Sequence, residues 1–262
     1  MDKKKKSDKN IKNTKAKKIN NNNSLKYYKN SEEFNTNKIN YHGYHRFYDF
    51  FLKPYKYKKF NFLELGVHKV GSLLMWNDYF KKAKIYGLDK IIRNEFENII
   101  KNKNIEIIKG DHSRKKDLQR LIKKTGKCKI IIDDGSHVPE HQLFNFNYLF
   151  KNCLDDDGIF IIEDIETSYW KNGNLYNYPI RAGFEKNNNI VQIFKEICDI
   201  VNYPFLLEEI KEKIYKKSKI YRDNLEEISM VSFGTNCIII KKKNKLENNL
   251  YEKNNYKFTH FL

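Results

Sequence analysis

Short apolar runs alternate with longer amphipathic stretches through the middle of the chain, and this alternation restricts the fold more than any other feature. The apolar runs are rich in β-branched or aromatic side chains, and each ends at or near a glycine or an acid. They lie at 60–67, 84–89, 105–111, 129–134 and 158–164. Runs of this kind are typical of parallel strands that are buried on both faces.

Stretches of helical length separate these strands. They lie at 71–82, 95–102, 115–125 and 139–153. A strand and helix alternation of this kind predicts the α/β class, with a doubly wound, Rossmann-like and mostly parallel sheet. A further helical pattern at 189–203 and a charged stretch at 207–227 precede two apolar runs around a glycine-containing turn. These runs, at 227–242, predict a C-terminal antiparallel hairpin.

The positive charge is concentrated near the two ends of the chain. The formal net charge is +18, but residues 1–30 hold eleven lysines against two aspartates, and residues 241–262 hold six lysines against two glutamates. The Lys/Asn-rich stretch has little to bury, so we expect a disordered tail over 1–36, one domain over 37–243 and a polar tail over 244–262. Because the middle is only mildly basic, we do not expect nucleic acid as a partner.

The sequence also bears on location. No apolar run approaches the about 20 residues of a membrane span, and the N-terminal stretch lacks the apolar segment of a signal peptide. The four cysteines have no metal-ligand spacing and lie within apolar patterns. Reduced thiols in the cytoplasm are therefore expected.

Acidic residues follow the predicted strands, at the sheet edge where open α/β sheets bind ligands. The first strand leads into "ELGVHKVGSL", where Glu64 precedes Gly66 and a helix begins near Ser72. This is not the G-x-G-x-x-G pattern of nicotinamide and flavin sites. An acid beside a loosened glycine turn suits a ligand with a cationic head, such as S-adenosylmethionine. We expect Glu64, Gly66 and Ser72 to contact this cofactor, Asp89 its ribose and Asp111 its base.

Two pairs of acids end neighbouring predicted strands. Asp133 and Asp134 are separated from Glu163 and Asp164 by a single helical crossover. At an adjacent-strand spacing of about 4.8 Å, carboxylates repel, so either one of them stays protonated or a cation holds them. Oxygen ligands without a nearby cysteine favour Mg²⁺, Mn²⁺ or Ca²⁺ over Zn²⁺. The alternative is that these acids cap the next helix and brace the loops.

His137, three residues after Asp134, adds a titratable base beside the expected cation. Methyl transfer from a sulfonium to a hydroxyl is an in-line displacement, so a protein that performs it has to align the two molecules and remove a proton. A metal lowers the pKa of the hydroxyl while an imidazole takes the proton, and both residue types are present.

Seven segments stand in a characteristic order: "KINYHGYHRFYD", "ELGVHKVGSLLMWNDYF", "IYGLDK", "KGDHS", "IIIDDGSH", "FIIEDIETSYW" and "SMVSFGTNCIIIKK". They resemble the conserved blocks of class I S-adenosylmethionine-dependent methyltransferases of the macrolide and rhamnosyl sugar O-methyltransferase type. The similarity spans about residues 38 to 242. The "IIDDGSH" and "IEDIETSYW" blocks are its most specific parts.

The resemblance implies the class I methyltransferase fold and a set of residue roles. By position in the motifs, Asp134, Glu163 and Asp164 are expected to bind Mg²⁺ (or Mn²⁺), with His137 as the base beside Asp134. Asp133 is expected to join the cofactor site. The tyrosine- and histidine-rich stretch at 41–48, within the first of the seven segments, is expected to be a lid or another element that covers the cofactor.

The expected function is Mg²⁺-dependent methyl transfer from S-adenosylmethionine to a hydroxyl of a sugar, in a glycan or a glycoside. A phenolic or catechol acceptor is the first alternative, because residues 169–178 are rich in aromatic side chains. The second is a non-catalytic module whose basic tails bind RNA or an acidic surface. After Trp170 the chain departs from the family, and an acceptor pocket would be shaped there. The resemblance also implies a homo-oligomer.

Overall fold

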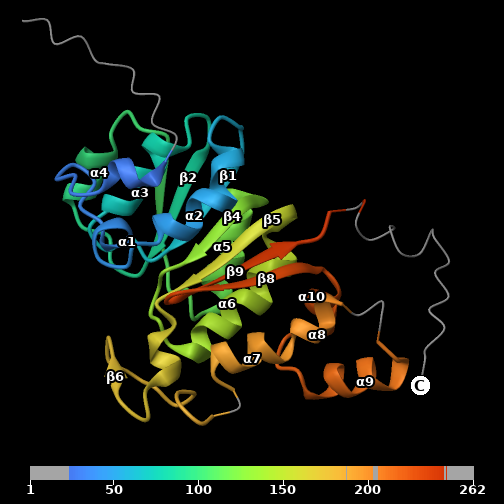
Figure 1. The fold of residues 1–262 in the computed structure, drawn as a ribbon. Helices are drawn as coiled ribbons and strands as arrows, with labels where there is room; N and C mark the ends of the chain where they lie inside the picture. The colour runs from blue at the N-terminus through green and yellow to red at the C-terminus, as the bar shows by residue number, and fades with distance from the viewer. Residues whose placement is uncertain (1–23, 187, 203–205, 245, 247–262) are drawn as a thin grey trace, which may run out of the picture.

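A seven-stranded sheet forms the centre of the computed structural model, which describes residues 24–186, 188–202, 206–244 and 246 (Figure 1). The strand order is β3-β2-β1-β4-β5-β9-β8, and β9 runs antiparallel to both of its neighbours. The strands are β1 (Asn61–Leu65), β2 (Lys84–Asp89), β3 (Ile105–Lys109), β4 (Cys128–Asp133), β5 (Leu154–Glu163), β8 (Ile228–Gly234) and β9 (Cys237–Lys242). The predicted doubly wound sheet with a C-terminal antiparallel hairpin is confirmed.

Helices cover both faces of the sheet (Figure 1). One layer consists of the 3-10 turn η1 (Leu25–Tyr28) with α1 (Asn37–Asn40), α2 (His45–Leu52), α3 (Gly71–Tyr79) and α4 (Glu95–Ile100). The opposite layer consists of α5 (Lys115–Thr125), α6 (Pro139–Asn152), α7 (Ile190–Glu196), α8 (Cys198–Val201) and α10 (Arg222–Glu226). The helix α9 (Glu208–Lys217) is the most charged of the described helices and has no fully buried residue. None of the described helices is both long and apolar enough to span a membrane.

The two layers explain why the strand sequences are apolar almost without interruption. Along β1, Leu63 and Leu65 belong to the core under α5 and α6, whereas Phe62 belongs to the core under α3. Along β4, Ile131 and Ile132 divide between the same two cores. Successive side chains of a strand point to opposite faces, so a strand covered on both faces needs apolar residues at every position.

Several elements differ from the sequence-based expectation. The single helix expected over 189–203 is interrupted at Ile197, between α7 and α8. The charged stretch forms α9 and α10. An unexpected hairpin of two short strands, β6 (Asn174–Leu175) and β7 (Tyr178–Pro179), follows the turn η3 (Ile165–Tyr169).

Residues 24–36 pack on the domain, whereas the sequence predicted a disordered tail as far as residue 36. Leu25 is fully buried, and the Tyr28 hydroxyl donates a hydrogen bond of 2.7 Å to Asp78. The Ser24 hydroxyl donates one of 2.6 Å to Asp49 on α2. The few apolar side chains of this segment are enough because Leu25 and Tyr28 join the core that also contains residues of α2 and α3. The rest of the expected tails, 1–23 and 247–262, lies outside the described residues.

The strand order reverses between β1 and β4, and the carboxyl ends of these strands meet at that point. Register places Leu65 opposite Asp133, so Gly66 and Asp134 leave the sheet side by side. Gly66 has φ +89°, and a Cβ atom there would lie 2.0 Å from the backbone oxygen of Asp134. Only glycine fits such an approach, and ligands of open α/β sheets bind at this kind of reversal.

The variant Gly66→Ala should destabilise the protein by more than the cost of placing an alanine at a positive φ, because its Cβ atom would also clash with the backbone of Asp134. Gly126→Ala is the matched control, because Gly126 also has a positive φ, of +65°, yet a Cβ atom there meets nothing within 4 Å. We expect Gly126→Ala to lower the free energy of unfolding by about 1–2 kcal/mol, and Gly66→Ala by at least about 2 kcal/mol more. Urea unfolding measures both, and equal losses would contradict the importance of the contact.

Candidate active site

The loop after β1 is held in an unusual conformation by the end of β2. His68 and Val70 both have positive φ angles, of 46° and 68°. Asp89 accepts hydrogen bonds from the backbone N–H groups of Val67, at 2.7 Å, and of His68, at 3.1 Å. A valine with this backbone is rare, and strain of this kind is found where a loop is shaped to hold a ligand.

Of the residues expected to contact the cofactor, Glu64 and Ser72 lie together beneath this loop. Ser72 donates a hydrogen bond of 2.8 Å to the buried carboxylate of Glu64. Gly66 begins the loop above them. Asp89 lies at the next strand end, where it braces the loop through its side chain. The sheet therefore brings these four residues to one edge, as expected from their positions after the strands.

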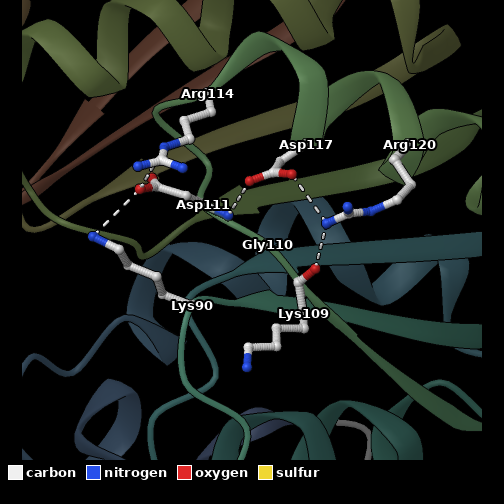
Figure 2. A pocket seen from close by; sticks show the side chains of 7 residues that line it. All are labelled: Lys90, Lys109, Gly110, Asp111, Arg114, Asp117 and Arg120. Carbon is white, nitrogen blue, oxygen red and sulfur yellow. Dashed lines mark hydrogen bonds and ion pairs between the residues drawn. The ribbon is translucent and has the colours of Figure 1, made fainter.

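Asp111 belongs to a neighbouring cavity of about 450 Å³ at the ends of β2 and β3 (Figure 2). Its walls are made largely of charged side chains. The lining residues are Lys90, Lys109, Gly110, Asp111, Arg114, Asp117 and Arg120. The carboxylate of Asp111 lies 3.3 Å from Lys90 and 3.6 Å from Arg114, so it is the anion that these two cations share.

Several neighbouring donors together hold the carboxylate of Asp111 in its ionised form. Burial alone would raise its pKa, but hydrogen bonds from the hydroxyl and the backbone N–H of Ser113, and the ion pair with Lys90, lower the pKa to about 2. A carboxylate with these donors is ionised at any pH near neutrality.

The two acids that end β4 face opposite sides of the sheet. Asp133 is buried and accepts a hydrogen bond of 2.9 Å from Asn145 on α6. Burial raises the pKa of Asp133. Asp134 instead faces the segment before α2 and is 26% exposed. Asp133 is thus separated from the other acids, and Asp134 is placed among them.

Lys38 joins three acids from three different strand ends. Its Nζ atom lies 2.9 Å from Glu64, 2.5 Å from Asp134 and 2.5 Å from Glu163. Lys38 comes from α1, and its side chain is only 3% exposed. The other oxygen of Glu163 accepts a hydrogen bond of 2.6 Å from Tyr48.

One ammonium cannot neutralise three carboxylates. Burial opposes the charge of Lys38, but the carboxylates of Asp134, Glu163 and Glu64 raise its pKa above the ordinary value. Burial raises the pKa of Glu64 and of Glu163. The surplus of negative charge favours either a proton or a second cation at this edge of the sheet.

A second group of side chains lies beside Lys38. Ligand atoms of Asp134, His137 and Asp164 lie within 4.8 Å of one another. The Nε2 atom of His137 is 3.7 Å from Oδ2 of Asp164, and the Oδ1 atom of Asp164 accepts a hydrogen bond of 2.5 Å from Tyr44. The carboxylate oxygens of Asp134 and Asp164, with surplus negative charge nearby, suit a hard divalent cation such as Mg²⁺ or Mn²⁺. The imidazole of His137 beside them is available as a base.

Glu163, expected with these ligands, is not part of that group in the structure. Both of its oxygens are engaged, by Lys38 and by Tyr48. Contacts of Lys38, Tyr44 and Tyr48 with these acids were not predicted from the sequence, although all three residues stand in the "KINYHGYHRFYD" segment. The spacing of polar and aromatic residues in that segment marked it as a functional segment. It did not indicate which acids these residues would contact.

Lys38→Met should destabilise the fold strongly, because it leaves three buried or half-buried carboxylates without their cation. We expect a loss of about 3–5 kcal/mol in the free energy of unfolding at pH 8, and a smaller loss at pH 5, where the carboxylates can take up protons. Lys81→Met is the control, since its pair with Asp78 is 46% and 44% exposed. That variant should change stability by less than about 1 kcal/mol. A similar small effect of Lys38→Met would show that its ion pairs are not needed.

Asp111→Asn should flatten the acid limb of the stability profile. The folded-state pKa of about 2 lies below the unfolded value of about 3.9, so Asp111 stabilises the protein above pH 4 and loses this effect as the pH falls through 2. Chemical unfolding between pH 2 and 5 measures the slope. Asp199→Asn, at an exposed position of α8, is the control and should leave the slope unchanged.

Comparison with known proteins gives relatives of one kind, although no family model matches the chain. Mycinamicin VI 2''-O-methyltransferase of Micromonospora griseorubida is 33% identical over 130 residues, which are 47% of this chain and 31% of that protein. Demethylmacrocin O-methyltransferase of Streptomyces fradiae is also 33% identical over 130 residues, which are 47% of this chain and 32% of that protein. The matched region is about a third of the length of these relatives.

Among solved structures, the chain is similar to the MycE methyltransferase from the mycinamycin biosynthetic pathway in complex with Mg and SAH. The TM-score is 0.69 at 25% sequence identity, and the match covers 84% of this chain and 55% of that chain. The seven-stranded sheet with its antiparallel end is the fold that the two proteins share.

Proposed function

We propose that this chain, which has the class I methyltransferase fold and resembles sugar O-methyltransferases, transfers a methyl group from S-adenosylmethionine to a hydroxyl of a sugar. One observation supports this above the others. Asp134, His137 and Asp164 converge within 4.8 Å, directly beside the glycine loop where β1 and β4 separate. A site for a proton acceptor and a cation therefore adjoins a site for a nucleotide-like cofactor.

In this proposal the end of β1 binds the methionine part of the cofactor. The strained loop that begins at Gly66 leads into the N-terminus of α3, a type of position that receives anionic groups. Glu64 lies beneath this loop, where Ser72 and Lys38 hold its carboxylate. Asp89 accepts hydrogen bonds from the ribose, and Asp111 lies near the base. Asp133 supports this side from behind, through Asn145.

The chemistry needs one bond to form as another breaks. The hydroxyl oxygen of the acceptor attacks the methyl carbon, the bond from carbon to sulfur breaks, and S-adenosylhomocysteine leaves. The hydroxyl proton passes to Nε2 of His137, which lies beside Asp164. The reaction depends on holding the acceptor hydroxyl in line with the methyl group of the cofactor. It also depends on removing the hydroxyl proton, because a sugar hydroxyl is a very weak acid.

Asp134 and Asp164 are proposed to be the residues that would hold Mg²⁺ or Mn²⁺, whereas Lys38 and Tyr48 engage both oxygens of Glu163. A bound divalent ion lowers the pKa of a coordinated hydroxyl, which is the contribution expected of it here. The relatives and the similar solved structure are much longer than the region that this chain matches. Their acceptors are therefore not transferred to this chain, and a sugar as its acceptor is proposed here. A cytoplasmic location and a homo-oligomer stay predictions.

Calorimetric titration of the full-length protein with S-adenosylmethionine, with and without Mg²⁺, tests the proposal first. Wild type should bind both. The double variant Asp134→Asn/Asp164→Asn should keep cofactor binding and lose the heat of Mg²⁺ binding, while the surface variant Asp223→Asn should behave like wild type. A wild-type protein that binds no S-adenosylmethionine under any of these conditions would overturn the methyltransferase proposal.

Turnover with a panel of glycosides and phenols then tests the base. His137→Gln should lower the rate constant by about 100-fold to 10,000-fold with little change in cofactor affinity, because only proton removal is lost.

Removal of residues 1–23 should leave methyl transfer unchanged, whereas a binding module that acts through its basic tail would lose its main activity.

A further inference from the structure

The hairpin β6–β7 lies in the part of the chain that departs from the family resemblance, and its turn is unusual. Tyr176 and Asn177 form the turn, with φ angles of 48° and 65°. Two successive residues with positive φ are what a tight hairpin connection requires. Asparagine adopts this backbone readily, but a bulky aromatic residue does so at a cost. A tyrosine at the first position is therefore unexpected on conformational grounds.

The second strand of the hairpin is fixed to the cofactor side of the site. The Nζ atom of Lys90 donates a hydrogen bond of 2.6 Å to the Tyr178 hydroxyl, and it also lies 3.3 Å from Asp111. The Tyr178 ring packs edge-on against His141 of α6, with ring centroids 4.9 Å apart. The hairpin is thus attached at the cavity of Figure 2 and at α6.

With Tyr178 held in this way, Tyr176 at the turn lies beside His137. Its ring centroid lies 5.9 Å from that of His137, at an interplanar angle of 52°. Tyr176 nevertheless stays 66% exposed, so much of its ring surface remains free. An exposed aromatic ring held beside a base by a constrained turn is available to a ligand.

We propose that Tyr176 is the platform on which the acceptor packs, and that its ring selects a sugar. The proposal rests on the methyl-transfer function proposed above and extends it to the acceptor. One face of a pyranose ring is made of C–H groups, and that face packs on the Tyr176 ring. The edge of the sugar then presents its hydroxyls toward His137, Asp134 and Asp164.

The surroundings of Tyr176 favour a sugar over a phenol. A sugar edge carries several hydroxyls, and the carboxylates of Asp134 and Asp164 can accept hydrogen bonds from more than one of them. A phenol offers a single hydroxyl and two apolar faces, so it needs apolar walls on both sides of its ring. Among the described residues, the aromatic ring in contact with His137 is that of Tyr176, and the nearest charged group is the carboxylate of Asp164, 3.7 Å from Nε2.

Two variants separate the ring from the turn. Tyr176→Asn removes the ring but suits the left-handed backbone, so the hairpin should still form. Tyr176→Phe keeps the ring and loses only the hydroxyl. Tyr221→Ala removes an exposed tyrosine at the start of α10, outside the site, and is the matched control.

The probe is methyl α-L-rhamnopyranoside, added to the full-length protein with S-adenosylhomocysteine and Mg²⁺. Saturation-transfer NMR reports whether the C–H groups of the sugar contact the protein, and a titration gives the affinity of the protein for the rhamnoside. We expect Tyr176→Asn to weaken binding about tenfold, and Tyr176→Phe and Tyr221→Ala to change it less than about twofold. With S-adenosylmethionine as the cofactor, the same loss should appear in KM and not in kcat.

Each other outcome overturns a defined part of the argument. Equal losses in Tyr176→Asn and Tyr176→Phe would assign the hydroxyl, and not the ring face, to binding. Binding of catechol that depends on Tyr176, without binding of the rhamnoside, would replace the sugar with a phenol. Unchanged rhamnoside binding in Tyr176→Asn would remove Tyr176 from the acceptor site. Failure of wild type to bind the cofactor at all would instead count against the proposed function, since Tyr176 does not contact that site.

Discussion

The ammonium of Lys38 is the interaction on which the rest of the site depends. Three strand ends deliver carboxylates to one small volume, and without a cation their mutual repulsion would oppose the packing of the strands. Lys38 lies within 3 Å of all three acids. It also ties α1 to the sheet edge, so the segment before β1 becomes part of the wall of the site.

The position of the acids could be predicted from the sequence, because parallel strands bring their carboxyl ends to one edge. Which acids would face each other could not be predicted so well. Asp133 and Asp134 are adjacent, yet the alternation of a strand sends one to Asn145 and the other to Lys38. At the next strand end the alternation fails, since Asp164 has a φ of 53° and turns the chain. Glu163 and Asp164 therefore both face the segment that holds Tyr44 and Tyr48.

Contacts between distant parts of the chain were the ones that pattern analysis missed. Lys38 is separated from Glu163 by 125 residues, and no periodicity connects them. The short hairpin of Tyr176 and Tyr178 has only two residues in each strand, too few for an alternating pattern. Its position depends instead on Lys90 and His141, which belong to other elements. Sheet and helices follow from local sequence; the walls of the site follow from tertiary contacts.

The acids of the site differ in how deeply they are buried, and their roles differ accordingly. Glu64 and Glu163 are essentially inaccessible, and the ammonium of Lys38 meets both of them, so it offsets part of their charge without any ligand. Asp134 and Asp164 are 26% and 15% exposed, and Oδ2 of Asp164 lies 3.7 Å from Nε2 of His137. Because one ammonium balances only part of the negative charge, the unbalanced part lies with the more accessible pair, where a divalent cation and an acceptor hydroxyl can reach it. Lys38 thus keeps the interior neutral enough to fold while leaving the outer edge of the cluster negative enough to bind.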